Sequence, residues 1–292
     1  MFLIGRNLRF IFKRQMKDKL IALEDVKKVH SVFRGKHGDS IAKKGLKLSG
    51  LNNVNSVYDY SKHLAGLEFC THLLDGLGIK RSVRNGEILE KYKDQPFITV
   101  SNHAYGHVDG IAIIELLGSY QPKFKMMVNF ILGMIDTMSE QFITVNPYDP
   151  DVFNRVSSLS GIKECIAHLQ EGNPLGLFPA GAISNLIRSN GKWVIEDRDW
   201  QPSVLKLIKF AEVPIIPIHI SGRNSSLFYL LGLIDWRLRN LRLGHELYNK
   251  KGKEIIFTVG EPISLEEQSK HSDLDSFGGY LKTKTYELSK SK

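Results

Sequence analysis

The fold is decided by residues 97–117, which read FITVSNHAYGHVDGIAIIELL. A short apolar run comes first, a polar loop with two glycines follows, and the second apolar stretch has the pattern of a helix. Strand, loop and helix in this order form the first half of a βαβ unit. Because ligands of parallel sheets bind beyond the carboxyl ends of the strands, a functional site is expected in the polar loop.

The same alternation continues toward the C-terminus. Apolar runs at 97–100, 125–128, 142–145, 175–178, 213–220 and 255–259 are predicted strands, and the segments 111–117, 155–169 and 203–210 are predicted helices. Strands that alternate with helices predict an α/β fold, with a mainly parallel sheet covered by helices. Residues 1–90 read instead as a helical N-terminal region, with a helix predicted from Val57 to Leu74, and residues 91–292 as the α/β domain.

The composition of the 292-residue chain is that of a globular protein, with 42% hydrophobic and 24% charged residues. This balance excludes intrinsic disorder, collagen-like repeats and coiled coils. The two cysteines, Cys70 and Cys165, are too few for a disulfide framework and form no CxxC pair. Neither a thiolate zinc site nor redox chemistry is therefore expected.

The net charge of +9 is contributed entirely by the N-terminus. Residues 1–50 carry thirteen Lys or Arg against four Asp or Glu, whereas the rest of the chain carries 27 of each sign. Between these charges, apolar residues at steps of three to four would line one face of a helix: Ile4, Leu8, Ile11, Phe12, Met16 and Leu20. Such a helix is typical of a segment that lies on an anionic bilayer, and an ordinary surface helix packed on the body fits the pattern equally well.

The sequence gives less support for nucleic-acid binding, for secretion and for a membrane-spanning helix. No recognition signature for nucleic acid accompanies the basic segment, so no nucleic-acid partner is expected. Arg6 and Arg9 interrupt the first apolar residues before the core of a signal peptide can form. The longest apolar runs, 213–220 and 227–234, are shorter than the roughly 20 residues that cross a bilayer. Any membrane contact is therefore expected to be peripheral, at the cytoplasmic face of the cell membrane.

His103 and Asp109 are the candidate acid–base pair in the loop after the first predicted strand. A histidine that removes a proton and an aspartate that fixes its tautomer are what acyl transfer to a hydroxyl requires. No GxSxG motif or histidine-flanked cysteine supplies a nucleophile, which favours direct attack by the acceptor. Two alternatives stay open: His103 caps backbone groups of its loop, or it binds a metal with His107 and Asp109, an arrangement that Gly106 disfavours. No metal is expected.

Two further polar turns follow predicted strands at the same edge of the sheet. Phe178-Pro179-Ala180-Gly181 ends the fourth strand, and its glycine permits a tight turn whose N–H groups would face a ligand oxygen. Ser221-Gly222-Arg223 ends the fifth strand, where Arg223 would pair with an anion or neutralise a helix end. Each pattern is also that of a plain turn.

Together these segments resemble the glycerolipid acyltransferases related to bacterial lysophosphatidate acyltransferase. Asn102-His103 with Asp109 is similar to their NH-x-Asp block, Phe178-Pro179-Ala180-Gly181 to their Phe-Pro-Glu-Gly block, and Val213-Pro214-Ile215-Ile216-Pro217 to their late Val-Pro-Ile-x-Pro strand. The resemblance implies that His103 is the general base and that Asp109 orients it. We take as candidate substrate-binding residues Asn102, Phe178, Pro179, Gly181 and Arg223.

Departures from the family pattern bear on the acceptor. Five residues separate His103 from Asp109 where four are usual, which resembles the hemolysin-like branch linked to ornithine- and glycine-lipid synthesis. Ala180 replaces the usual Glu, no Arg follows Gly181 at the customary place, and the run 142–146 lacks the Arg of the phosphate-binding block. An acceptor without a glycerol phosphate head, such as a hydroxyacylated amino acid, fits these losses.

The sequence therefore predicts an O-acyltransferase at the membrane surface. It would move a fatty acyl group from a thioester of acyl carrier protein or coenzyme A to a lysolipid hydroxyl, without a further cofactor. Backbone N–H groups around Gly181 would stabilise the oxyanion. The alternatives are a lysophosphatidate acyltransferase proper, with Arg155, Arg188 or Arg223 holding the phosphate, a hydrolase, and a catalytically silent lipid-binding protein.

Overall fold

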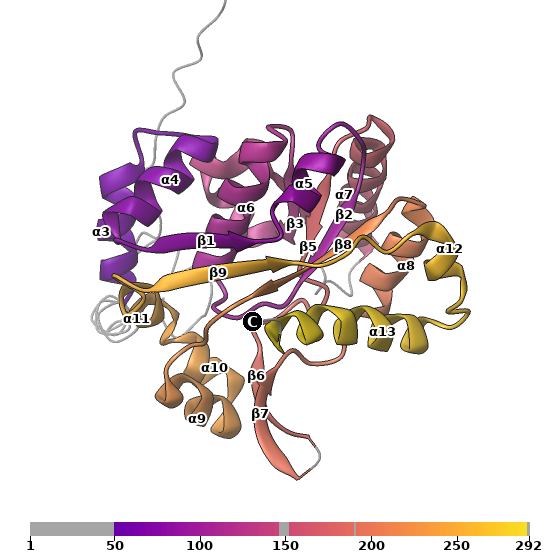
Figure 1. Cartoon of the computed structure of the whole chain (residues 1–292). Coiled ribbons are helices and arrows are strands. Elements are labelled where there is room, and N and C mark those ends of the chain that lie inside the picture. The colour runs from indigo at the N-terminus through magenta and orange to yellow at the C-terminus, as the bar shows by residue number, and fades with distance from the viewer. Residues whose placement is uncertain (1–49, 146–151, 190, 291–292) are drawn as a thin grey trace, which may run out of the picture.

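A seven-stranded sheet forms the centre of the computed structural model, which describes residues 50–145, 152–189 and 191–290 (Figure 1). Its strands are β1 (Lys80–Arg84), β2 (Ile98–Ser101), β3 (Lys125–Asn129), β4 (Phe142–Val145), β5 (Leu175–Leu177), β8 (Ile215–Ile220) and β9 (Glu254–Val259). The six apolar runs of the sequence correspond to β2, β3, β4, β5, β8 and β9. The predicted α/β fold is confirmed.

The strands lie in the order β1-β9-β8-β2-β5-β3-β4. The neighbours from β8 to β4 pair in parallel, whereas β9 runs antiparallel to β8, and β1 pairs in parallel with β9. β2 is the central strand, with Val100 opposite Leu177 of β5 and Pro217 of β8. The carboxyl ends of the parallel strands therefore meet at one edge, and the loop after β2 leaves from the middle of it.

Helices cover both faces of the sheet (Figure 1). On one face, α4 (Gly66–Gly76), α5 (Glu87–Tyr92) and α6 (Val108–Tyr120) share a core with the strands, and on the other α7 (Val152–Gln170), α8 (Pro202–Ala211) and α13 (Leu274–Glu287) do so. The other described helices are α3 (Leu51–Ser61), α9 (Ser226–Ile234), α10 (Trp236–Asn240), α11 (Leu243–Tyr248) and α12 (Leu265–Ser269), with the 3-10 helices η2 (Phe130–Met134), η3 (Asp136–Gln141) and η4 (Leu288–Lys290). Within the described ranges, no helix combines the length and the apolar character needed to span a bilayer.

Strand β8 shows why the predicted strands are apolar at nearly every position. Ile216, Ile218 and Ile220 are buried in the core on one face of the sheet, and Ile215 is buried in the core on the other. Because helices cover both faces, the strand has no solvent-facing side that would need polar residues. Continuous apolar runs rather than alternating ones are the result.

The N-terminal part of the fold differs from the prediction in two ways. The single helix expected from Val57 to Leu74 is two helices, α3 and α4, because the chain turns between them and enters α4 at Gly66 with a φ of +58°, outside the right-handed helical region. β1 lies inside the region predicted to be helical, and its polar sequence fits its place at the edge of the sheet.

The predicted basic helix of residues 1–20 lies outside the described residues. The domain division at residue 90 stays a prediction.

A hairpin that was not among the predicted elements projects from the sheet (Figure 1). It consists of β6 (Asn185–Ser189) and β7 (Lys192–Glu196), which pair antiparallel with Ser189 opposite Lys192. The dipeptide Asn190-Gly191 between these strands is a strong sequence signal for a two-residue hairpin turn. The hairpin occupies the chain between β5 and α8 and so brings residue 197 back to the carboxyl edge of the sheet.

We expect Ile218→Ala to lower the free energy of unfolding by about 2–5 kcal/mol, because it removes part of a fully buried side chain and leaves a cavity. Leu265→Ala, at a side chain that is 47% exposed, should change the free energy by no more than about 0.5 kcal/mol. Urea unfolding followed by circular dichroism measures both values. Equal losses in the two variants would contradict the assigned core.

Candidate active site

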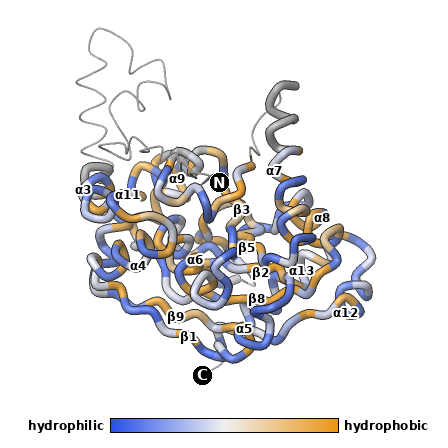
Figure 2. The backbone as a smooth tube through the Cα atoms, turned by 90° about the horizontal axis from the view of Figure 1, so that it is seen from above, coloured by the Kyte–Doolittle hydropathy of each residue, from blue (hydrophilic) through white to orange (hydrophobic). Residues whose placement is uncertain are grey.

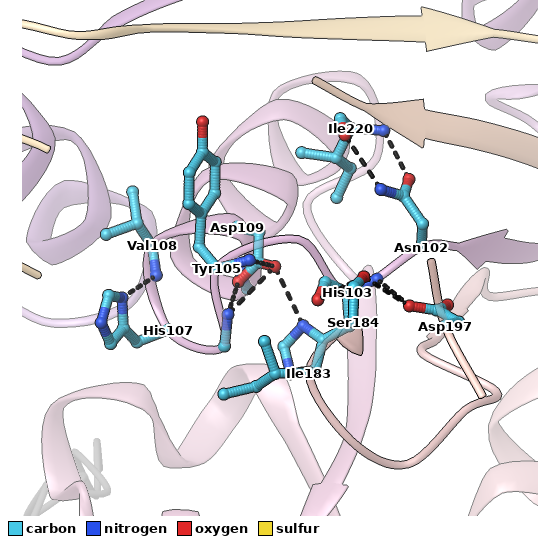
Figure 3. Close-up of polar contacts among 12 residues, drawn as sticks. Asn102, His103, Tyr105, His107, Val108, Asp109, Ile183, Ser184, Asp197 and Ile220 are labelled. Atoms are coloured by element: carbon cyan, nitrogen blue, oxygen red, sulfur yellow. Dashed lines mark hydrogen bonds and ion pairs between the residues drawn. The ribbon is translucent and has the colours of Figure 1, made fainter. Parts of the chain in front are cut away.

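His103 and Asp109 meet at the carboxyl edge of the sheet, between the end of β2 and the first turn of α6 (Figure 3). The Nδ1 atom of His103 lies 3.0 Å from Oδ2 of Asp109. Because an ionised carboxylate only accepts hydrogen bonds, Nδ1 is the donor, and the lone pair of the neutral ring is on Nε2. This is the arrangement of a general base that a carboxylate holds in one tautomer.

Asp109 is completely buried, and its carboxylate accepts several hydrogen bonds. Besides the imidazole, it accepts the backbone N–H groups of Tyr105 at 2.7 Å, Gly106 at 3.0 Å and Gly110 at 3.0 Å. Its place in the first turn of α6 adds the attraction between a negative charge and a helix N-terminus. These partners replace the water that a buried charge has lost.

Gly106 accommodates the fifth residue between His103 and Asp109. Its φ is +90°, and a Cβ atom at this position would lie 2.2 Å from Cδ1 of Ile183. Glycine avoids both the backbone strain and the clash. The longer spacing is therefore compatible with a direct contact between the two side chains.

The two side chains shift each other's pKa in opposite directions. Burial alone lowers the pKa of His103, but the charge and the hydrogen bond of Asp109 outweigh it, so that the pKa is raised. Burial alone raises the pKa of Asp109, but the charge of His103 and the hydrogen bonds to the carboxylate lower it to about 2. Asp109 is therefore ionised at neutral pH, and His103 binds a proton more readily than a free imidazole does.

A second buried carboxylate, Asp197, holds the main chain of His103. Its Oδ1 accepts the His103 N–H at 3.3 Å and the Ser184 hydroxyl at 2.7 Å, and the Ser184 N–H donates to the His103 carbonyl at 2.8 Å. Burial raises the pKa of Asp197, although the hydrogen bonds oppose this shift. The sequence pattern did not identify Ser184 or Asp197, because no motif connects Asp197 with a histidine 94 positions away. The available signal was the Asn190-Gly191 turn, which predicts a hairpin that ends just before Asp197.

His107 does not join the pair. It is the N-cap of α6, where its Nδ1 accepts the Val108 N–H at 2.7 Å and its Nε2 donates to the Leu243 carbonyl at 2.9 Å. Burial lowers the pKa of His107 to about 4, so the ring is neutral and both nitrogens are engaged. A metal ligand needs an available nitrogen lone pair, so this geometry gives the metal alternative no support. Among the described residues there is also no cluster of three or more potential metal ligands.

The side chain of Asn102 links two strand ends and is not among the described residues that line the cavity next to His103. Its Nδ2 donates to the Ile220 carbonyl at 2.9 Å, and its Oδ1 accepts the Ile220 N–H at 2.7 Å (Figure 3). The side chain is buried, and both ends of its amide are occupied by backbone groups. The structure therefore places this candidate substrate-binding residue where it fixes the end of β2 to the end of β8.

The turn after β5 contributes two of its predicted residues to the cavity, Phe178 and Gly181. The Phe178 ring stacks on the His103 imidazole with 4.1 Å between the ring centroids. The Gly181 N–H donates to the Phe178 carbonyl at 2.9 Å, so it closes the turn rather than facing a ligand. Pro179 accepts the Gln201 N–H through its carbonyl, and the exposed Arg223 lies outside the cavity lining.

A cavity of about 630 Å³ extends from His103 between α6, β3, β4, α7 and α8. Among its described lining residues, only the two histidines, His103 and His107, are ionisable. Most of the others are aliphatic, sulfur-containing or aromatic, for example Ile111, Ile114, Met127, Phe142, Ile162 and Leu207. Such a lining suits a hydrocarbon chain and offers no partner to a charged group.

Known proteins resemble this chain along most of its length. The family model described as Acyltransferase matches residues 31–292. A lyso-glycine lipid O-acyltransferase of Bacteroides thetaiotaomicron is 28% identical over 250 residues, which cover 83% of this chain and 87% of that protein. A protein of the same name from Phocaeicola vulgatus is 25% identical over 287 residues, covering 94% and 98%. The crystal structure of the 1-acyl-sn-glycerophosphate (LPA) acyltransferase PlsC from Thermotoga maritima aligns with 92% of this chain and 94% of that chain, at 14% identity and a TM-score of 0.47.

We expect Asp109→Asn to lower the pKa of His103, because the substitution removes the negative charge that stabilises the imidazolium. The ring should then lose its proton at a lower pH than in the wild type. NMR titration of the histidine ring signals measures the change, and Asp275→Asn, which alters the net charge equally at an exposed site, is the control. An unchanged His103 pKa in Asp109→Asn would contradict an ionic pair.

Asn102→Ala should destabilise the fold rather than weaken substrate binding. It deprives the buried N–H and carbonyl groups of Ile220 of their partners, which costs about 1–3 kcal/mol. Urea unfolding measures the loss, and Michaelis constants of the purified variant measure substrate binding. Unchanged stability with a raised KM would restore the substrate-binding role expected from the sequence.

Proposed function

The chain belongs to the acyltransferase family and is an acyltransferase, and from this premise we propose that it moves a fatty acyl group from a thioester to the hydroxyl group of a lysolipid. The observation that carries the proposal is that His103, held by Asp109, lines an apolar cavity of about 630 Å³. The cavity suits a fatty acyl chain, and the pair suits removal of a proton from a hydroxyl at the cavity wall.

In this proposal the acceptor attacks the thioester directly. Nε2 of neutral His103 takes the hydroxyl proton while the acceptor oxygen bonds to the carbonyl carbon. Asp109 stabilises the imidazolium and keeps the ring oriented. When the tetrahedral intermediate collapses, the carbon–sulfur bond breaks, and the leaving thiolate receives the proton from His103. The products are an ester and a thiol, and the enzyme is back in its starting state.

The oxyanion of the intermediate requires hydrogen-bond donors near the reacting carbon. Since the Gly181 N–H already closes its own turn, we assign this role to the side-chain amide of Gln201. Gln201 lines the same cavity and lies against Gly181, where a Cβ atom would come within 2.1 Å of its Nε2. The contact between Nε2 and the Ala180 carbonyl is long, at 3.4 Å, so the amide is weakly held and can turn toward a substrate oxygen.

The cysteines do not offer an alternative, covalent route. Cys70 and Cys165 are both completely buried. Burial raises the pKa of each thiol, to about 12 for Cys165. A thiol that is not ionised at neutral pH is a poor nucleophile, so the scheme has no acyl-cysteine intermediate.

For the acceptor we propose an amino-acid lysolipid, such as a lyso-glycine lipid, rather than lysophosphatidate. Both curated relatives are named for a lyso-glycine lipid. No Lys or Arg is among the described residues that line the cavity, and Arg188 and Arg223 are exposed outside it. The side chain of Arg155 lies outside the described residues. A phosphate head would therefore lack the cationic partners that it normally requires.

For the donor we propose a thioester of acyl carrier protein or coenzyme A, with no additional cofactor. We also propose that the enzyme works as a peripheral protein on the cytoplasmic face of the cell membrane. The acceptor would be a membrane lipid, and residues 1–50 carry nine more positive than negative charges. Each Lys or Arg close to an anionic leaflet contributes about 1 kcal/mol of attraction.

We expect His103→Ala to lower kcat by roughly 10²–10⁴-fold, because the general base is lost. His107→Asn is the matched control and should retain most of the activity, since asparagine also accepts a hydrogen bond at a helix N-terminus. Purified enzyme, an acyl thioester and a lysolipid suffice for the assay, run with and without a chelator. Equal losses in both variants together with inhibition by the chelator would favour the metal alternative.

The purified enzyme should acylate an amino-acid lysolipid with a kcat/KM at least about tenfold higher than lysophosphatidate, because the described residues that line the cavity include no Lys or Arg to compensate a buried phosphate. Mass spectrometry of the products, with the same acyl thioester for both acceptors, measures the ratio. Comparable rates would contradict the proposed acceptor. Arg188→Ala and Arg223→Ala would then identify the residue that holds the phosphate.

A further inference from the structure

Helix α9 is apolar on its exposed side as well as on its buried side. After Ser226 it contains no charged residue. Phe228 and Tyr229 are buried in a small core with Ile183. The other side of the helix exposes Leu227, Leu230, Leu233 and Ile234, of which Ile234 is 76% exposed. Their spacing of three and four positions puts them on one side of the helix, where a surface helix ordinarily has polar residues.

This apolar surface continues into α10, where Trp236 is 60% exposed. We define the α9–α10 face as Leu227, Leu230, Leu233, Ile234 and Trp236. Residues 223–243 contain four Arg and one Asp; of these arginines, Arg223 is exposed, Arg239 is buried and Arg242 lies 4.0 Å from Glu246. The hairpin β6–β7 packs on α9 and lies on the same side of the sheet as α9 (Figure 1), and its Arg188 and Lys192 are exposed.

We propose that the α9–α10 face inserts into the interface of an anionic lipid bilayer. Leucine and isoleucine with a tryptophan and flanking arginines are the composition of a helix that lies at the boundary between headgroups and acyl chains. The positive charges complement an anionic leaflet. A second copy of this chain would instead bring like charges together, which disfavours association.

Helix α10 is joined to the active site through a chain of hydrogen bonds that begins at Arg239. Arg239 of α10 donates to the carbonyls of Ile183 at 3.3 Å and Ser184 at 3.5 Å, and Ser184 holds the carbonyl of His103. α9 follows β8 at the carboxyl edge of the sheet, and α9 and the end of β3 lie along that edge (Figure 2). Insertion would bring the membrane surface next to His103, where a lysolipid hydroxyl is presented; this step rests on the proposed function.

Trp236 provides a direct test in the full-length chain. In Trp193→Phe, the other two tryptophans remain, and Trp200 is only 4% exposed, so changes in emission report on Trp236. Vesicles of phosphatidylglycerol and phosphatidylethanolamine should shift the emission to shorter wavelength, and phospholipids with brominated acyl chains should quench it. The effect should persist at 1 M salt, where the Debye length is about 3 Å and the basic N-terminal segment contributes little. Unshifted and unquenched emission at saturating vesicle concentrations would overturn the proposal.

Leu230→Glu tests the same face by loss of binding. It should lower the vesicle partition coefficient by about tenfold, or about 1.4 kcal/mol. Leu265→Glu in α12 is the matched control, because Leu230 and Leu265 are similarly exposed, at 54% and 47%, and the two helices lie on opposite sides of the molecule (Figure 2). Thermal unfolding establishes that both variants are folded. Equal binding by both would overturn the proposal, as would a Leu230→Glu variant that binds normally but alters a monomer–dimer equilibrium in gel filtration.

Turnover separates this inference from the proposed function. Leu230→Glu should acylate lysolipid dispersed in detergent at the wild-type rate and lysolipid embedded in vesicles more slowly. If Leu230→Glu matched the wild-type rate on vesicle-embedded lysolipid as well as on detergent-dispersed lysolipid, the role of the α9–α10 face would be contradicted. Quenching of Trp236 by vesicles in an enzyme that acylates no lysolipid would support membrane insertion and contradict the proposed function.

Discussion

The carboxylate of Asp109 must stay ionised inside the protein, and the conformation of the loop between β2 and α6 follows from that requirement. Dehydration of a charge is tolerated only when fixed donors replace the lost water. Here three backbone N–H groups and the His103 ring supply them, so the carboxylate of Asp109 holds the chain at four points between residue 103 and residue 110. The donors are in place before any substrate binds, and the imidazole therefore does not have to be oriented during the reaction.

The sequence predicted those features whose signal is contained in a few neighbouring residues. The six apolar runs became strands of the sheet, and His103 and Asp109, six positions apart, make the expected contact. The contacts it could not reveal join a side chain to a distant main chain, as between Asn102 and Ile220, which are 118 positions apart. Such a contact requires a particular residue at one end only, because every residue has the same backbone N–H and carbonyl groups. For the same reason the contact of Asp197 with the His103 N–H left no sequence pattern. The edge strand β1 was missed for a different reason: it pairs with only one neighbouring strand, and so it could remain polar.

Phe178 connects the acid–base pair with the hydrocarbon cavity. Its ring stacks on the His103 imidazole, and Phe178 also lines the cavity. An aromatic face attracts a cation, so the ring is compatible with both charge states of the histidine and at the same time keeps water from one side of it. In the proposed reaction, a hydrocarbon chain and a transferred proton would therefore meet within one layer of side chains.

The left-handed backbone of Gly106 has an evolutionary consequence. Deleting one residue from this loop would turn Asp109 by about 100° around the helix axis and away from His103, unless the loop were rebuilt. Replacing the glycine would drive a side chain into Ile183, which lies between β5 and β6. The number of residues in the loop, the glycine and its isoleucine neighbour therefore have to change together. A lineage with this loop is therefore separated from one with a shorter loop by coordinated changes rather than by a single deletion.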